Sequence, residues 1–138
     1  MKKLLLVAAA LITSAFLSNA IFAHHSTAGF QTDKAVRIEG TITKFRWTNP
    51  HASFKIEGSA EGFEDSLWSI EMTAPNVLKN SGWKRSSLKK GDKVVVFANP
   101  TVDDSARLGD GSRGGLYVGV ILADGTSLGR VDGEAGRE

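Results

Sequence analysis

Residues 36–57 read VRIEGTITKFRWTNPHASFKIE, two runs of alternating apolar and polar residues separated by Thr48-Asn49-Pro50. Alternation with a period of two predicts β-strands, and the Asn-Pro pair predicts a turn between them. In the first run the apolar residues lie on one face and then change face: Val36, Ile38 and Ile42, followed by Phe45 and Trp47. A change of face within one strand predicts a bulge or a sharp coil, which we place at Gly40 because glycine relaxes the backbone.

The rest of the chain supplies the other elements of a small β domain. The second strand alternates inward apolar and outward polar residues: Ala52, Phe54 and Ile56 against His51, Ser53, Lys55 and Glu57. A third strand at 66–72 points Trp68, Ile70 and Met72 inward. Thr73 and Gly82 are typical of the start and the end of a helix over 74–81. The remaining predicted segments are a hairpin loop at 58–65, strands at 93–98 and 116–122 with a loop at 99–115 between them, and a short extension at 126–128.

These elements follow in the order strand, strand, strand, helix, strand, strand. The order is typical of a five-stranded OB-like barrel, an all-β fold with one short helix, and a bent first strand suits it. A small open sandwich is the alternative. We expect residues 24–128 to form this single domain, with 24–34 as a polar arm and 129–138 as a disordered tail rich in glycine and charge.

Composition excludes several classes of function. Of the 138 residues, 41% are hydrophobic and 23% are charged, which is typical of a globular protein. Lysine and arginine total 17 and aspartate and glutamate total 15, so loss of Lys2 and Lys3 with a leader leaves no net charge. A broad nucleic-acid-binding face is therefore not expected. Because the chain has no cysteine, disulfides, thiolate zinc sites and cysteine nucleophiles are excluded.

Residues 1–23 have the parts of a secretory signal peptide, which are two lysines, a charge-free apolar stretch and a cleavage region. The apolar stretch is shorter than the roughly 20 residues that span a bilayer as a helix. No membrane span is therefore expected after cleavage. Cleavage after Ala23 makes His24 the first residue, and cleavage after Ala20 is the alternative. We expect the mature protein to be periplasmic.

The chain has three histidines, His24, His25 and His51. At a mature N-terminus, the amine and the ring of His24 can together chelate one Cu(II) ion. His51, at the outward start of the second strand, supplies a further nitrogen, and a planar set of nitrogens suits copper better than zinc. Glu71 or Met72, at the end of the third strand, is the candidate axial or outer group. The alternative is a solvated N-terminus and a third histidine that only bonds its own turn.

Other chemistry has less support in the sequence. No nucleophile is paired with a base, so no catalytic residue is predicted. The Gly-Asp-Gly-Ser-Arg-Gly-Gly run at 109–115 lacks the ending of a phosphate-binding loop and predicts a flexible loop. Trp47 and Trp68 fall on inward faces and are expected in the core. Trp83 follows the helix stop beside Lys84, and we expect it to cap the open end of the barrel or to contact a partner.

Several short motifs occur together along the chain: Ala23-His24-His25-Ser26, Gly40-Thr41, Trp47-Thr48-Asn49-Pro50-His51, Trp68 with Glu71, Pro75-Asn76-x-Leu78, Gly82-Trp83 and Leu88-Lys89-x-Gly91-Asp92. In combination they resemble the domain of unknown function 6152 family, small exported bacterial proteins, over most of residues 23–128. The resemblance implies a single-domain β protein with a signal peptide, and it implies that all three histidines lie at motif positions. It implies no particular reaction. The chain departs from the pattern where Ala52 and Ser53 precede the next aromatic residue, Phe54.

Two functional hypotheses come from different classes of protein. The first is a periplasmic protein that binds copper through His24 and His51, with His25 assisting and Glu71 nearby, for capture or delivery. The second is a metal-free OB-like interaction module that binds an envelope protein or a small ligand through the barrel face or the 99–115 loop. An oxidative copper enzyme is a third and weaker hypothesis, because the sequence shows no recognisable acid, base or substrate cleft.

Overall fold

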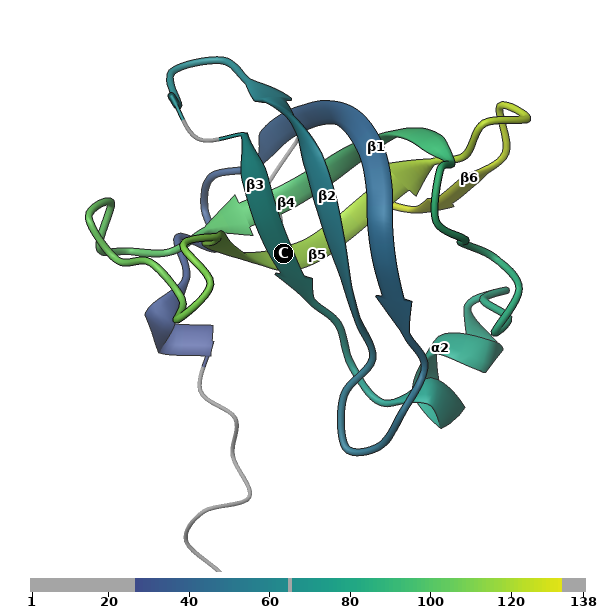
Figure 1. The fold of residues 1–138 in the computed structure, drawn as a ribbon. Helices are drawn as coiled ribbons and strands as arrows, with labels where there is room; N and C mark the ends of the chain where they lie inside the picture. Colours follow the sequence, from purple (N-terminus) through teal and green to yellow (C-terminus); the bar gives the residue numbers. More distant parts are fainter. Residues whose placement is uncertain (1–26, 65, 133–138) are drawn as a thin grey trace, which may run out of the picture.

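A computed structural model describes residues 27–64 and 66–132 of the chain (Figure 1). Its elements follow in this order: the 3-10 turn η1 (Thr27–Gly29), β1 (Val36–Arg46), β2 (Ser53–Ala60), β3 (Leu67–Glu71), α2 (Pro75–Asn80), β4 (Lys93–Pro100), β5 (Arg113–Ile121) and β6 (Ser127–Gly129). The predicted order of three strands, one helix and two strands is confirmed, and the short β6 stands where an extension was expected.

One sheet closes into a barrel. The strand order is β3-β2-β1-β4-β5-β6, and β3 also pairs in parallel with β5, which joins the two ends of the five-stranded part. β1 pairs with β4 as far as Thr41 and with β2 from Ile38 onward, and Figure 1 shows it bending between these partners. The predicted all-β, OB-like barrel with one short helix is therefore confirmed, and its closure excludes the open sandwich.

The irregularity in β1 lies at Thr43, so the prediction that placed it at Gly40 is wrong. Pairing with β2 shifts between Ile42 and Lys44, which leaves Thr43 as the extra residue. Gly40 instead pairs regularly with Gly58, and a side chain on either glycine would collide with the backbone of the other strand. These glycines allow the two strands to approach closely, and the extra residue accounts for the change of face after Ile42.

The barrel interior holds the apolar side chains that the alternation placed inward. The predicted inward faces of the second and third strands are confirmed, because all of their members are buried: Ala52, Phe54, Ile56, Trp68, Ile70 and Met72. Trp47 is also buried, as predicted. The opposite faces of the same strands point outward, and they therefore form the outer wall on which a binding site can be built.

Two predicted loops are shorter than expected, because glycine-rich segments form strands. β2 runs through the first part of the predicted 58–65 loop. β5 begins inside the predicted 99–115 loop, since Gly114 and Gly115 pair with β3 where the barrel closes. A Cβ atom on Gly115 would lie 2.9 Å from Cδ1 of Ile70. A side chain here would displace its neighbour, so the glycine fits close packing at the closing seam and does not mark a flexible loop.

α2 is shorter than the predicted 74–81 helix, and its N-cap differs. The N-cap residue is Ala74, without a side-chain capping hydrogen bond, so the assignment of Thr73 is wrong. Ala74 is extended because the proline that follows it disfavours helical backbone at the preceding residue. Gly82 has a left-handed φ of 86° and ends the helix as predicted. Leu78 is buried and anchors α2 on the barrel.

The segment before β1, predicted as an arm, is held against the end of β4. Phe30 pairs with Thr101, and the backbone N–H of Gln31 donates to the carbonyl of Pro100 at 2.9 Å. The side-chain amide of Gln31 donates to the carbonyl of Thr101 at 2.8 Å. These contacts fix η1 beside the barrel. Residues 24–26 of the predicted arm lie outside the described part of the chain.

At the other end, the described chain continues past the predicted domain boundary at residue 128. Gly129, the last residue of β6, pairs with Gly119 of β5. The N–H of Arg130 donates to the carbonyl of Val118 at 3.0 Å. The start of the predicted tail therefore belongs to the sheet, and residues 133–138 lie outside the described residues.

Trp83 is buried, so the predicted partner contact is wrong, whereas burial is consistent with the other predicted role, a cap at the end of the barrel. Its indole N–H donates to the hydroxyl of Tyr117 at 3.2 Å, and that hydroxyl donates to the carbonyl of Leu128 at 2.7 Å. The two rings meet edge to face, with centroids 5.3 Å apart. Burial raises the pKa of Tyr117 to about 12, against a smaller lowering by the hydrogen bond from Trp83.

We expect the tyrosine absorbance of the folded protein to titrate near pH 12, above the ordinary tyrosine pKa of about 10. Tyr117 is the only tyrosine in the chain, so an alkaline absorbance titration reports on it alone. Because the folded state holds this proton more tightly, its contribution to stability is present below about pH 10 and is lost as the pH rises toward 12. A midpoint near pH 10 in the folded protein would contradict the burial of this hydroxyl.

Candidate functional site

His51 lies in the turn between β1 and β2, beside the end of β3. The pairing of β2 with β3 continues one step beyond both strands, since the N–H of Met72 donates to the carbonyl of Ala52 at 2.9 Å. This pairing brings His51 next to Met72, whose carbonyl lies 3.0 Å from Nδ1 of the imidazole. A carbonyl only accepts, so Nδ1 carries the proton in this contact, and the neutral ring carries its lone pair at Nε2.

Glu71, the last residue of β3, points to the same side of the barrel. Its Oε1 lies 3.8 Å from Nδ1 of His51. The side chain of Glu71 is 45% exposed and that of His51 is 27% exposed. The carboxylate therefore stands near the protonated side of the ring. Met72 is fully buried, with its side chain in the core, so the structure excludes the predicted use of its sulfur as an axial ligand. Its backbone carbonyl orients His51 instead.

Two hollows meet at the His51–Glu71 pair. The larger has a volume of about 360 Å³ and is lined by Phe30, Arg46, Thr48, Asn49, Pro50, His51, Ser53, Ser69, Glu71, Thr101, Leu108, Gly114 and Gly115. The smaller has a volume of about 210 Å³ and is lined by Thr27, Phe30, His51, Glu71, Met72, Thr73 and Leu116. Both hollows share Phe30, His51 and Glu71, so this pair stands between them.

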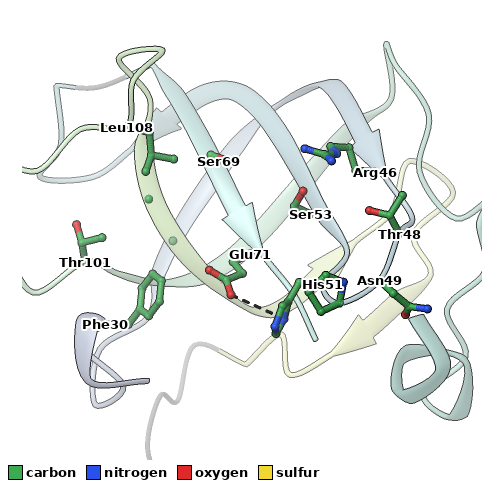
Figure 2. Close-up of a pocket in the computed structure, with 13 residues that line it drawn as sticks. Phe30, Arg46, Thr48, Asn49, His51, Ser53, Ser69, Glu71, Thr101 and Leu108 are labelled. Carbon is green, nitrogen blue, oxygen red and sulfur yellow. Dashed lines mark ion pairs between the residues drawn. The ribbon is translucent and has the colours of Figure 1, made fainter. Parts of the chain in front are cut away.

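The larger hollow, which we call the wall pocket, lies on the outer face of the barrel. Figure 2 shows Arg46 and Thr48 on one side of it and Phe30, Thr101 and Leu108 on the other. An ion pair between Lys55 and Asp110 ties the loop at 101–112 to β2 and so holds one rim in place. The lining combines hydroxyl, amide and charged groups with one aromatic ring, which suits a small polar ligand.

The other two predicted ligands, His24 and His25, lie outside the described residues. Thr27 is the described residue nearest to them in sequence, and it lines the smaller hollow together with His51. Two residues of chain span at most about 7 Å, so His25 starts within that distance of Thr27. Within residues 27–64 and 66–132, no group of three metal-ligating side chains is present, and the predicted set is represented there by His51 and Glu71.

The sequence did not reveal the rest of this site. Phe30 reaches the pocket because it pairs with Thr101, 71 positions further along the chain, and no local pattern indicates that contact. Ser53 was correctly predicted to face outward, and Ser69, between the inward Trp68 and Ile70, lies on the outward face of its strand. One signal for a hollow was available in the sequence. Ser53 and Ser69 are both small, and larger residues flank them on the outward faces of their strands.

Together, the fold and the site define a small β-barrel protein with a histidine–carboxylate pair and a polar pocket on its outer wall. A family model described as a family of unknown function, DUF6152, matches residues 11–112. The chain belongs to this family. The match includes β1 to β4, the turn that carries His51 and the loop that forms one rim of the wall pocket. No curated protein and no solved structure matches the chain.

Among residues 27–64 and 66–132, no helix combines the length and the apolar character needed to cross a membrane.

Proposed function

We propose that this protein is exported to the periplasm, loses residues 1–23 and binds one Cu(II) ion at His51. The remaining ligands are the terminal amine and ring of His24, with the ring of His25 assisting. The function is capture or delivery of copper. Copper here is the cargo of the protein, and no catalytic residue is assigned.

One observation carries this proposal: Thr27 and His51 line the same hollow of about 210 Å³. Contacts of Phe30 and Gln31 hold this part of the chain against the end of β4, and Thr27 thereby lines the hollow. His24 lies three residues before Thr27 and therefore starts within about 11 Å of it. The proposal requires that the side chain and the terminal amine of His24 reach the imidazole of His51 from this position.

The hydrogen bond to Met72 gives the neutral ring of His51 the tautomer that a metal ligand needs. Histidines that bind metals donate one ring N–H to a carbonyl or a carboxylate, which orients the ring and raises the basicity of the other nitrogen. His51 donates from Nδ1 to the Met72 carbonyl, so Nε2 is its ligating atom. Nitrogen ligands in a plane favour Cu(II) over the other divalent metals.

Glu71 serves as an outer group in this proposal. Its Oε1 lies 3.8 Å from the nitrogen of His51 that faces Met72, which is the side away from the ligating atom. The carboxylate therefore adds negative charge behind the ring and strengthens Nε2 as a donor.

The direct test is a competition titration of the processed protein with Cu(II) against a chelator of known affinity. We expect one tightly held equivalent in the wild type and weak, non-stoichiometric uptake in a His24→Ala, His51→Ala double variant. Asn49→Ala, in the same exposed turn, is the matched control and should bind as the wild type does. Equal uptake by the wild type and the double variant would contradict the proposal.

The wall pocket favours a second candidate function, a metal-free module that binds a small polar ligand or an envelope protein. Its volume of about 360 Å³ is within the range of small-molecule sites. Ser69→Trp would fill this pocket while leaving the His51–Met72 contact in place. Retention of a partner by the wild type in the presence of a metal chelator and by His24→Ala, together with its loss in Ser69→Trp, would favour this function over copper binding.

A further inference from the structure

The segment from α2 to the turn before β4, residues 75–91, carries five cations and no acidic residue. We call it the basic segment, and its cations are Lys79, Lys84, Arg85, Lys89 and Lys90. All five are exposed. None of them forms an ion pair with a residue that the structure describes. Their charge is therefore not neutralised within the described part of the molecule.

The basic segment is anchored so that its cations face outward. Leu78, Trp83 and Leu88 are buried in the barrel core. Each of these three residues is followed directly by one or two of the cations. Hydrogen bonds hold the end of the segment on β1, where the N–H of Gly91 donates to the carbonyl of Ile42 at 2.8 Å. The segment thus presents its charges from a fixed backbone, which lowers the entropy lost when they bind a partner.

Three of these cations surround one hollow. It has a volume of about 520 Å³ and is lined by Trp47, Lys79, Gly82, Trp83, Lys84 and Arg85. No acidic side chain is among the residues that line it. Lysine and arginine around a hollow without a carboxylate favour an anionic group, and a phosphate is the anion that both side chains bind well.

Five acidic groups lie at the other end of the barrel, whereas Asp92 directly follows the basic segment. Asp103, Asp104 and Asp110 occupy the loop at 101–112, and Glu61 and Glu64 the hairpin after β2. Figure 1 shows this loop and this hairpin on the left of the barrel, and α2 with the chain that follows it on the right. These five carboxylates are therefore remote from the basic segment, and an anionic surface would orient the molecule with the basic segment toward that surface.

We propose that the basic segment docks the protein on the surface of an anionic lipid bilayer, with lipid phosphates in the hollow between Lys79, Lys84 and Arg85. A bilayer surface offers many phosphates in one plane, which matches several cations spread over one segment. Val77, on α2 beside Lys79, is 48% exposed, and an apolar side chain among cations suits the interface between headgroups and acyl chains. This docking does not depend on copper and brings the protein to a membrane without a membrane-spanning helix.

The test is sedimentation of the processed protein with vesicles. One set contains phosphatidylcholine alone, and in the other phosphatidylglycerol replaces a third of the lipid. We expect binding to the second set only, weakened by salt because the contacts are between exposed charges. Each cation near an anionic surface contributes about fivefold to partitioning, so Lys84→Gln with Arg85→Gln should lower it about 25-fold.

Lys34→Gln with Arg107→Gln is the matched control, since it removes the same charge from residues outside the basic segment. This control should bind the anionic vesicles as the wild type does. Equal binding to both vesicle sets, or an equal loss in the control, would overturn the proposal. Competition by soluble polyphosphate at the same phosphate concentration, with the same dependence on Lys84 and Arg85, would also overturn it and identify a soluble polyanion as the partner. Copper uptake should be unchanged in both double variants.

Discussion

Replacing His51 with alanine is expected to lower the Cu(II) affinity of the protein that starts at His24 by about 100-fold or more. The physical reason is the loss of the one imidazole in the described part of the chain, which the barrel holds in place with Nδ1 bonded to the Met72 carbonyl at 3.0 Å. Loss of a group that merely orients a ligating histidine costs about 10- to 100-fold, and loss of the ligand costs at least as much. Competition with a chelator at neutral pH measures the change.

Two further variants separate a ligand from its surroundings. Glu71→Gln removes the charge 3.8 Å from Nδ1 and should weaken copper binding by about tenfold or less, because the residue acts behind the ring. One glycine added before His24 leaves every side chain in place but moves the amine out of the chelate, and should weaken binding about as much as His51→Ala. Wild-type affinity in this extended protein would contradict the role of the terminal amine.

Trp68→Ala is expected to destabilise the barrel by about 3–5 kcal/mol, because it empties a large, fully buried site. Trp68 lies in β3, where it pairs with Ile56 on one side and with Arg113 across the closing seam on the other. Its ring meets Phe63 edge to face at 5.2 Å, and the guanidinium of Arg113 lies 5.6 Å from its centroid. Removing the indole therefore opens a cavity at the seam that joins the two ends of the sheet.

Urea unfolding of the apo-protein measures this loss, and Val77→Ala is the control. Val77 is half exposed, so its truncation should change stability by no more than about 0.5 kcal/mol. A loss below about 1 kcal/mol in Trp68→Ala would contradict the placement of this tryptophan in the core.

The strands and their inward faces could be predicted because alternation depends on local sequence. Ala52, Phe54 and Ile56 are buried as predicted, because one-sided burial imposes a period of two on the chain. The same pattern also contained the position of the bulge. Ile42 and Phe45 are three positions apart, so the extra residue had to lie between them and not at Gly40.

The seam could not be predicted because its cause is not local. Gly114 and Gly115 were interpreted as a loop, but they pair with Ser69 and Ile70, more than forty positions earlier in the chain. The burial of Trp83 also depends on a distant contact, since its hydrogen-bond partner Tyr117 lies 34 positions away. Composition near the two glycines indicated a flexible loop, and long-range strand pairing decided otherwise.

The sequence predicted two residues of the candidate site, His51 and Glu71, because they lie at the ends of neighbouring strands. His51 and Glu71 were expected at adjacent ends of the second and third strands, and the pairing of β2 with β3 brings them to 3.8 Å. The wall pocket was missed, because Phe30 and Leu108 reach it from segments whose positions depend on closure of the barrel. The contribution of His24 and His25 stays a prediction.

The central claim is best tested by the intact mass of the protein exported by a bacterial host, recorded under native conditions with and without added copper. We predict a mass that begins at His24 and gains one copper, and a His51→Ala protein of the same start that gains none. A mass that begins at Ile21, or a protein that begins at His24 and retains no copper, would contradict the claim.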